Sequence, residues 1–90
     1  MNPDTILALR SDVRHTRVGE EGVVLRQDDA EILVVNDSAA RFIELIDGST
    51  SIDQLAQALL GEYDTDKATL LADLLEFSRE LAAIGALETQ

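Results

Sequence analysis

The sequence predicts a single α+β domain in which a three-stranded antiparallel sheet precedes three helices. Short runs rich in β-branched residues fill residues 13–36, and apolar residues at helical spacing fill residues 37–84. Turn and cap residues separate these runs. Strands grouped before helices are typical of α+β domains rather than of parallel α/β sheets. The chain has 90 residues, a length that suits one domain.

The three strands are expected at residues 13–18, 22–27 and 31–35. Gly19 and Gly22 enclose two acidic residues and indicate a hairpin turn. The polar run 27–30 then predicts a second turn, so the strands form a meander.

The third strand has an unusual composition, because Ile32, Leu33, Val34 and Val35 are all apolar. One interpretation is a strand buried on both faces inside the core. The other is an edge strand whose second face or open backbone takes a partner.

The first helix is expected to begin within residues 36–38, where each side chain can cap, and to run to Asp47 before Gly48. Ser51 and Gln54 have the spacing of a capping box, which opens a second helix that ends at Gly61.

The third helix is expected at about residues 66–84, capped within 64–66 and ended by Gly85. Its apolar stripe is wide, and it comprises Leu70, Leu71, Leu74, Leu75, Phe77, Leu81, Ala82 and Ile84. A small meander followed by three helices is a winged helix-turn-helix-like composition. Residues 1–12 show little pattern and are expected to form a flexible N-terminal arm before the domain at residues 13–88.

The charge balance disfavours nucleic acid and anionic membranes as partners. Eighteen acidic residues against seven Lys and Arg give a net charge of −11, whereas DNA binders neutralise phosphates with Lys and Arg. Within residues 50–85 only Lys67 and Arg79 are cationic. A winged-helix transcriptional regulator is nevertheless an alternative, since fold does not dictate function. The start of the chain lacks a signal-peptide pattern, and we expect a cytoplasmic protein.

The sequence offers no set of catalytic or cofactor-binding residues. It contains no cysteine and one histidine, His15, so a zinc site or a catalytic triad lacks supporting residues. Asp73, Glu76 and Glu80 are spaced as helical neighbours. This spacing fits a weak carboxylate metal site, but a solvated helix face is the plainer interpretation. We therefore expect no enzyme activity, cofactor or metal.

An acyl-carrier-like protein is a further alternative. Such carriers are small, acidic and modified on a serine at a helix start, and Asp37–Ser38 occupies that position. Carriers, however, have a long helix before that serine, and this chain has strand patterning there.

An ordered set of segments resembles the PqqD family and spans residues 13–88. No single motif is diagnostic, but their order is fairly specific. The segments are Gly22–Leu25, Leu33–Ala40, Leu45–Gly48, Ser51–Leu55, Leu59–Leu60, Tyr63–Asp64, Asp73–Phe77, Leu81 and Gly85–Glu88.

This resemblance implies a RiPP recognition element, a non-catalytic chaperone of ribosomally made, post-translationally modified peptides. The leader of the precursor peptide would add as a strand to the third strand and enter a groove beside the third helix. The domain would present the peptide to a modifying enzyme, either a radical SAM enzyme or a lasso-peptide leader peptidase. The peptide-binding residues implied are Glu31, Ile32, Leu33, Val34, Val35, Leu70, Leu71, Leu74, Leu75, Phe77, Ser78 and Leu81.

Two departures leave the pathway open. A Pro-Glu pair is expected before the third strand in proteins of pyrroloquinoline quinone biosynthesis, but residues 29–31 read Asp-Ala-Glu. Lasso-type proteins usually have Leu-Asn-x-Thr-Gly at the first helix, where residues 38–40 here read Ser-Ala-Ala.

Overall fold

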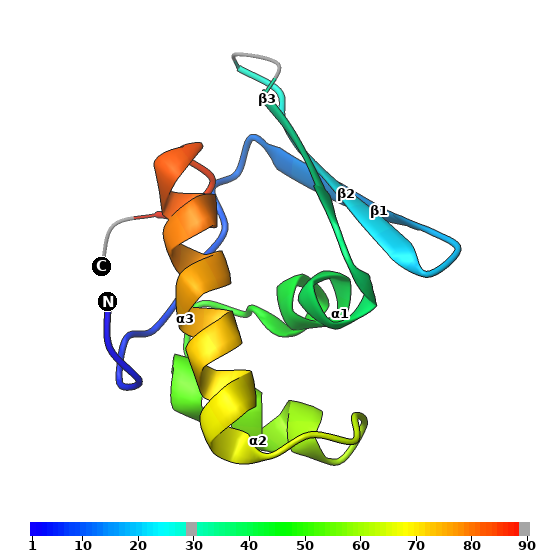
Figure 1. Ribbon diagram of the computed structural model, residues 1–90. Coiled ribbons are helices and arrows are strands. Elements are labelled where there is room, and N and C mark those ends of the chain that lie inside the picture. The colour runs from blue at the N-terminus through cyan, green and yellow to red at the C-terminus, as the bar shows by residue number, and fades with distance from the viewer. Residues whose placement is uncertain (29–30, 89–90) are drawn as a thin grey trace.

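The computed structural model describes residues 1–28 and 31–88 and confirms the predicted α+β class (Figure 1). Three strands come first and three helices follow. The elements are β1 (Val13–Val18), β2 (Glu21–Arg26), β3 (Glu31–Val35), α1 (Asp37–Leu45), α2 (Ile52–Leu60) and α3 (Lys67–Ala83).

The strands form one antiparallel sheet in the order β1-β2-β3, so β3 is an edge strand. Val18 pairs with Glu21 across a two-residue turn that begins at Gly19, whose φ is 63°. This short turn starts β2 one residue earlier than the sequence predicted. The expected turn at residues 27–30 lies only partly within the described residues.

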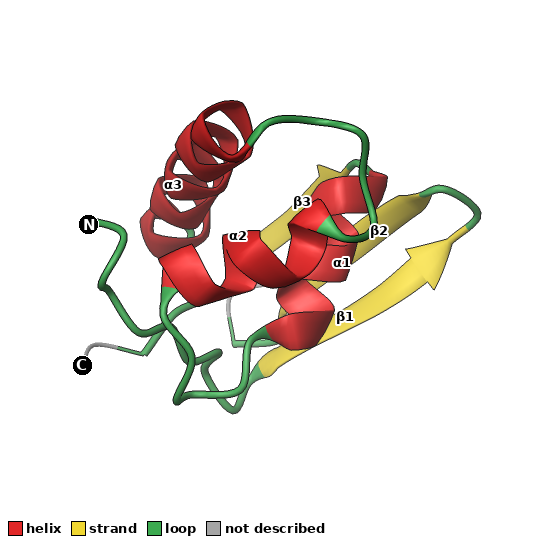
Figure 2. Cartoon of the chain, turned by 90° about the horizontal axis from the view of Figure 1, so that it is seen from below, coloured by secondary structure: helices red, strands yellow, loops and turns green. Residues whose placement is uncertain are grey.

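Helix α1 packs closely against the middle strand of the sheet (Figure 2). A Cβ atom on Gly22 would lie 2.7 Å from Cβ of Ala40 and 3.0 Å from a methyl group of Val35. Gly22 therefore lets α1 approach the sheet more closely than any residue with a side chain would allow.

The first helix ends two residues before the predicted end at Asp47. The Asp47 carboxylate accepts hydrogen bonds from the Ser49 amide at 3.0 Å and the Thr50 hydroxyl at 2.9 Å. Asp47 thus belongs to the turn around Gly48, whose φ is 82°, because short polar side chains bond to the backbone two residues on.

The helix caps agree with the sequence. The Asn36 side chain accepts from the Ala39 amide, and Ser51 with Gln54 completes the capping box. Asp66 caps α3, and Gly85, with a φ of 73°, follows its last turn. These caps satisfy amide groups that would otherwise lack partners.

The N-terminal segment packs against the domain in the structure, and its flexibility stays a prediction. Leu7 is 2% exposed. Isolated bridges join Ile6 to Ser51 and Leu9 to Leu87. The main chain of residues 3–10 also bonds to the α1–α2 connection and to the C-terminal segment. The buried side chain of Leu7 and several main-chain hydrogen bonds hold this segment against the domain.

The core lies between the sheet and the three helices. Phe42 and Phe77 meet edge to face at its centre, with ring centroids 6.0 Å apart and an interplanar angle of 67°. Residues buried with them include Val24, Ile43, Ile52, Leu55, Leu59, Leu70, Leu74 and Leu81. Among the described residues, no helix is long and apolar enough to span a bilayer.

Candidate functional site

A groove of about 440 Å³ runs between the end of β3, the start of α1 and one face of α3. In Figure 1 these three elements frame the same side of the molecule. The residues that line the groove are Val34, Val35, Asn36, Ser38, Ala39, Leu70, Asp73, Leu74, Glu76, Phe77 and Glu80.

The floor of the groove is apolar and already well packed. Leu70, Leu74 and Phe77 on α3 are 4%, 3% and 8% exposed, and Val35 and Ala39 are 7% and 9% exposed. The acidic residues of α3 that line the groove are exposed. The groove is therefore a shallow trough with an apolar floor and an acidic wall.

The free edge of β3 borders this groove. Beside the β1–β2 ladder, the Gln27 amide donates to the Asp12 carbonyl at 3.0 Å. This bond shows that Gln27 directs its main-chain groups toward β1. Successive residues of an antiparallel strand face alternate neighbours, so the odd-numbered residues of β2 face β1 and the even-numbered residues face β3. The same alternation directs the N–H and C=O groups of Ile32 and Val34 away from β2. An edge strand with unpaired main-chain groups is a template for another strand.

The side chains of β3 alternate between the two faces of the sheet. Leu33 pairs with the fully buried Val24 and so faces the helices, whereas Ile32 and Val34 face outward and are 63% and 59% exposed. The interpretation of β3 as a strand buried on both faces is therefore wrong. The apolar run belongs to an edge strand with one open face.

The structure brings five of the twelve sequence-predicted binding residues to the groove, which are Val34, Val35, Leu70, Leu74 and Phe77. Glu31, Ile32 and Leu33 lie on β3 outside the groove lining. Leu71 and Leu75 are half-buried and pack against the core instead.

Ser78 and Leu81 are not at the groove either. Each is 0% exposed, and the Ser78 hydroxyl donates to the Leu74 carbonyl at 2.7 Å within the helix. The apolar stripe of α3 was too wide to show which flank meets α2 and which meets the groove.

Sequence reasoning missed six groove residues, which are Asn36, Ser38, Ala39, Asp73, Glu76 and Glu80. The spacing of the three acids also fits a solvated helix face. The same spacing indicates that the three acids border the apolar stripe of α3. At 3.6 residues per turn they fall on one flank of the buried stripe, next to Phe77. No group of three or more possible metal ligands converges within residues 1–28 and 31–88.

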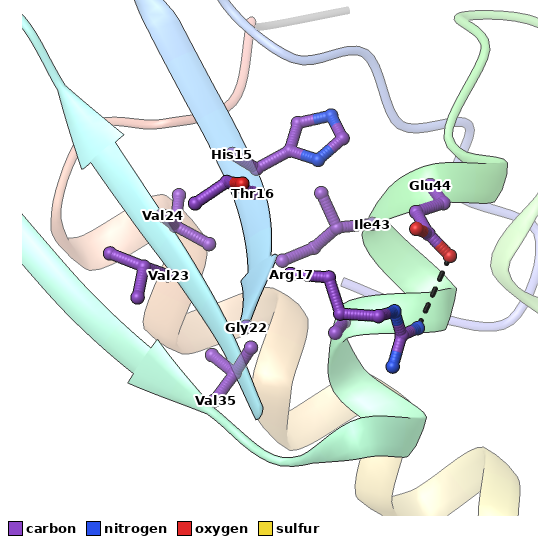
Figure 3. Close-up of a pocket in the computed structure, with 10 residues that line it drawn as sticks. His15, Thr16, Arg17, Gly22, Val23, Val24, Val35, Ile43 and Glu44 are labelled. Atoms are coloured by element: carbon purple, nitrogen blue, oxygen red, sulfur yellow. Dashed lines mark hydrogen bonds and ion pairs between the residues drawn. The ribbon is translucent and has the colours of Figure 1, made fainter. Parts of the chain in front are cut away.

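A polar network positions the α1 end of the groove. The Tyr63 hydroxyl donates to Oδ2 of Asp37 at 2.7 Å, and Arg17 on β1 pairs with the other oxygen of Asp37. Arg17 also pairs with Glu44 at 3.2 Å, beside a cavity of about 10 Å³ (Figure 3). His15, which lines that cavity, is exposed. The network ties β1, α1 and the α2–α3 loop together.

The network shifts the ionisation of its members. The hydrogen bond from Tyr63, followed by that from Arg17, holds the pKa of Asp37 below its ordinary value. Arg17 likewise lowers the pKa of Glu44. Burial, followed by the hydrogen bond to Asp37, raises the pKa of Tyr63 to about 12. At neutral pH the Tyr63 hydroxyl therefore keeps its proton and donates a hydrogen bond, and the carboxylates of Asp37 and Glu44 are charged.

The fold argues against the two alternative functions. A strand, not a long helix, precedes Ser38, whose hydroxyl lies 3.1 Å from Oδ1 of Asn36 within the cap. A carrier-type modification site therefore lacks its usual support. For DNA binding, α2 and α3 offer Lys67, which is paired with Asp53 at 3.0 Å, and Arg79. Two cations on an acidic surface do not make a phosphate-binding face.

The chain is similar in sequence to proteins named PqqA binding proteins. A PqqA binding protein of Xanthomonas oryzae pv. oryzae is 32% identical over 80 residues, which cover 87% of this chain and 85% of its own. A PqqA binding protein of Xanthomonas euvesicatoria pv. vesicatoria is 33% identical over 76 residues, covering 82% and 80%.

Solved structures share the fold. The structure of TbiB1 in complex with the TbiA(beta) leader peptide has a TM-score of 0.78 at 23% identity and covers 91% of this chain and 95% of its own. The solution structure of the PqqD truncation of Methylobacterium extorquens PqqCD is described as a functional and stand-alone RiPP recognition element. It has a TM-score of 0.78 at 28% identity and covers 99% and 100%.

The family is shown by the sequence as well as by the fold. Residues 21–87, from the first residue of β2 to the segment after α3, match the family described as coenzyme PQQ synthesis protein D. The matched segment includes every element that lines the groove. The chain belongs to the PqqD family.

Proposed function

We propose that this protein binds the leader segment of a ribosomally made precursor peptide as a fourth strand along β3. The observation that carries the proposal is the free edge of β3, where the main-chain groups of Ile32 and Val34 point away from β2 beside an open groove. Strand addition gives affinity through main-chain hydrogen bonds, and pockets for alternate side chains give specificity. Val34, Val35, Leu70, Leu74 and Phe77 are the proposed contact residues.

The relatives support this assignment. Similar proteins from Xanthomonas are named PqqA binding proteins, and a solved structure of the same fold holds a leader peptide. PqqD-type recognition elements are binding proteins, and we propose that this chain likewise acts without catalysis. By holding the precursor beside a modifying enzyme, it would raise the effective concentration of the peptide at that enzyme. The enzyme is of the radical SAM or leader-peptidase type, and the cytoplasm is the proposed compartment.

The proposal is tested by calorimetric titration with precursor peptides encoded beside the gene, on the wild type and on Val34→Pro. Proline removes the outward N–H of residue 34 but no bond of the β2–β3 ladder. We expect saturable binding by the wild type and a loss of at least about fivefold in Val34→Pro, since one hydrogen bond contributes about 1 kcal/mol.

Two controls separate this effect from damage to the fold. Val34→Ala shortens the side chain but keeps the N–H, so it should lose clearly less affinity than Val34→Pro. His15→Pro places the same residue on the outer edge of β1, where its N–H also points away from the ladder, and should leave binding unchanged. Equal affinity of Val34→Pro and the wild type, or no binding of any encoded peptide, would contradict the proposal.

A further inference from the structure

The charge of the groove is one-sided. Of the described residues that line it, only Asp73, Glu76 and Glu80 carry a charge, and all three are acidic. In the described part of the chain none of these carboxylates forms an ion pair, whereas Asp37, Glu44 and Asp53 do. Their negative charges are therefore available to a ligand.

The apolar floor offers little open surface to the same ligand. Leu74 and Phe77 are 3% and 8% exposed, so they present little apolar surface to a bulky apolar side chain. A lysine or arginine side chain fits this wall better. Its methylene stem can lie over Leu74 and Phe77 while its charged head reaches a carboxylate.

The spacing of the acids suits an extended peptide. Glu76 and Glu80 are four residues apart, which is about 6 Å along a helix. Alternate residues of a strand point to the same face and are about 6.8 Å apart. These two spacings match closely enough that residues i and i+2 of a strand paired with β3 can face two successive acids of α3.

We propose that the groove selects peptides with lysine or arginine at positions i and i+2 of the segment that pairs with β3, facing Glu76 and Glu80. The inference rests on the proposed strand addition and goes beyond it by naming the side chains that are recognised. Exposed charge pairs of this kind weaken with salt, so the selectivity falls as ionic strength rises.

The test uses two capped eight-residue peptides, one of alternating valine and lysine and one with glutamine at each lysine position. Each is titrated into the isotope-labelled chain and followed by NMR shifts. The lysine peptide should shift resonances along β3 and residues 70–80, and the glutamine peptide should bind more weakly. Affinity for the lysine peptide should fall roughly three- to tenfold in Glu76→Gln/Glu80→Gln, as expected for two exposed ion pairs.

The control is Glu20→Gln/Glu21→Gln, which removes the same charge from the exposed end of the β1–β2 hairpin and should leave the affinity unchanged. Equal affinity for the two peptides, equal loss in the two double variants, or no binding of the lysine peptide would overturn the inference. Failure of the proposed function looks different. A lysine preference that persists in Val34→Pro would contradict strand addition while leaving the charge selectivity in place.

Discussion

The Tyr63 hydroxyl donates a hydrogen bond of 2.7 Å to Oδ2 of Asp37, the first residue of α1. Tyr63 lies in the connection between α2 and α3, 26 residues further along the chain. The bond therefore fixes the start of α1, which forms one end of the groove, relative to the connection that leads into α3. Asp37 also forms an ion pair with Arg17 of β1, so its carboxylate joins α1, β1 and the α2–α3 connection.

Loss of the Tyr63 hydroxyl should cost stability. We expect Tyr63→Phe to lower the free energy of unfolding by about 0.5–1.5 kcal/mol, the usual contribution of one hydrogen bond. Urea unfolding monitored by circular dichroism measures this change. In the Asp37→Asn background, Tyr63→Phe should lower the free energy of unfolding by a smaller amount. An equal loss in both backgrounds would show that the hydroxyl acts independently of Asp37.

The network should also make the free energy of unfolding depend on pH. The pKa values of Asp37 and Glu44 are lower in the folded chain than their ordinary values, so folding favours the charged forms. Their contribution is complete above the ordinary carboxyl pKa and is lost as the pH falls through the lowered values. Urea unfolding from about pH 6 to about pH 2 should show the advantage of the wild type over Asp37→Asn shrinking. A constant difference would contradict this account.

The close approach of α1 to the sheet predicts a strong effect at Gly22. In Gly22→Ala the added Cβ meets Ala40 at 2.7 Å, and the overpacking should lower the free energy of unfolding by about 1–3 kcal/mol. Gly61→Ala is the matched control, because its Cβ would meet nothing closer than 3.7 Å. Thermal or urea unfolding should show little loss in the control. Similar stability of both variants would contradict the packing described.

A charge at Val34 should weaken peptide binding. Val34 and Val18 are exposed on the same outer face, at 59% and 63%, but only Val34 lies on the edge strand beside the groove. We expect Val34→Lys to lower leader affinity up to about fivefold, because it replaces an apolar cross-strand contact. Val18→Lys changes the net charge equally and should bind as the wild type does. Matching losses in calorimetry would mean that the effect is one of charge alone.

Local signals in the sequence predicted most of the fold. The Ser51–Gln54 capping box and the cap at Asp66 depend on interactions within a few residues, and the structure confirms them. The first helix ends at Leu45, two residues before the end that the sequence predicts. The bonds that Asp47 makes to Ser49 and Thr50 compete with the helix, and helical periodicity does not report such competition.

The candidate site was harder to predict, because it depends on arrangement. An apolar run such as Ile32–Val35 is compatible with a central strand and with an edge strand, and only the strand order shows that β3 is at the edge. Likewise, Glu76 and Glu80 have the spacing of a solvated helix face. Their place at a groove depends on which side of α3 turns toward β3, and that is set by packing in the core.

Amide hydrogen exchange on the labelled chain tests the central claim most directly. Without peptide, the outward amides of Ile32 and Val34 should exchange quickly, whereas those of Leu33 and Val35, bonded to β2, should be protected. A leader peptide that binds should slow exchange at Ile32 and Val34 and leave His15, on the opposite edge, unchanged. Binding without new protection at these two amides would contradict strand addition to β3.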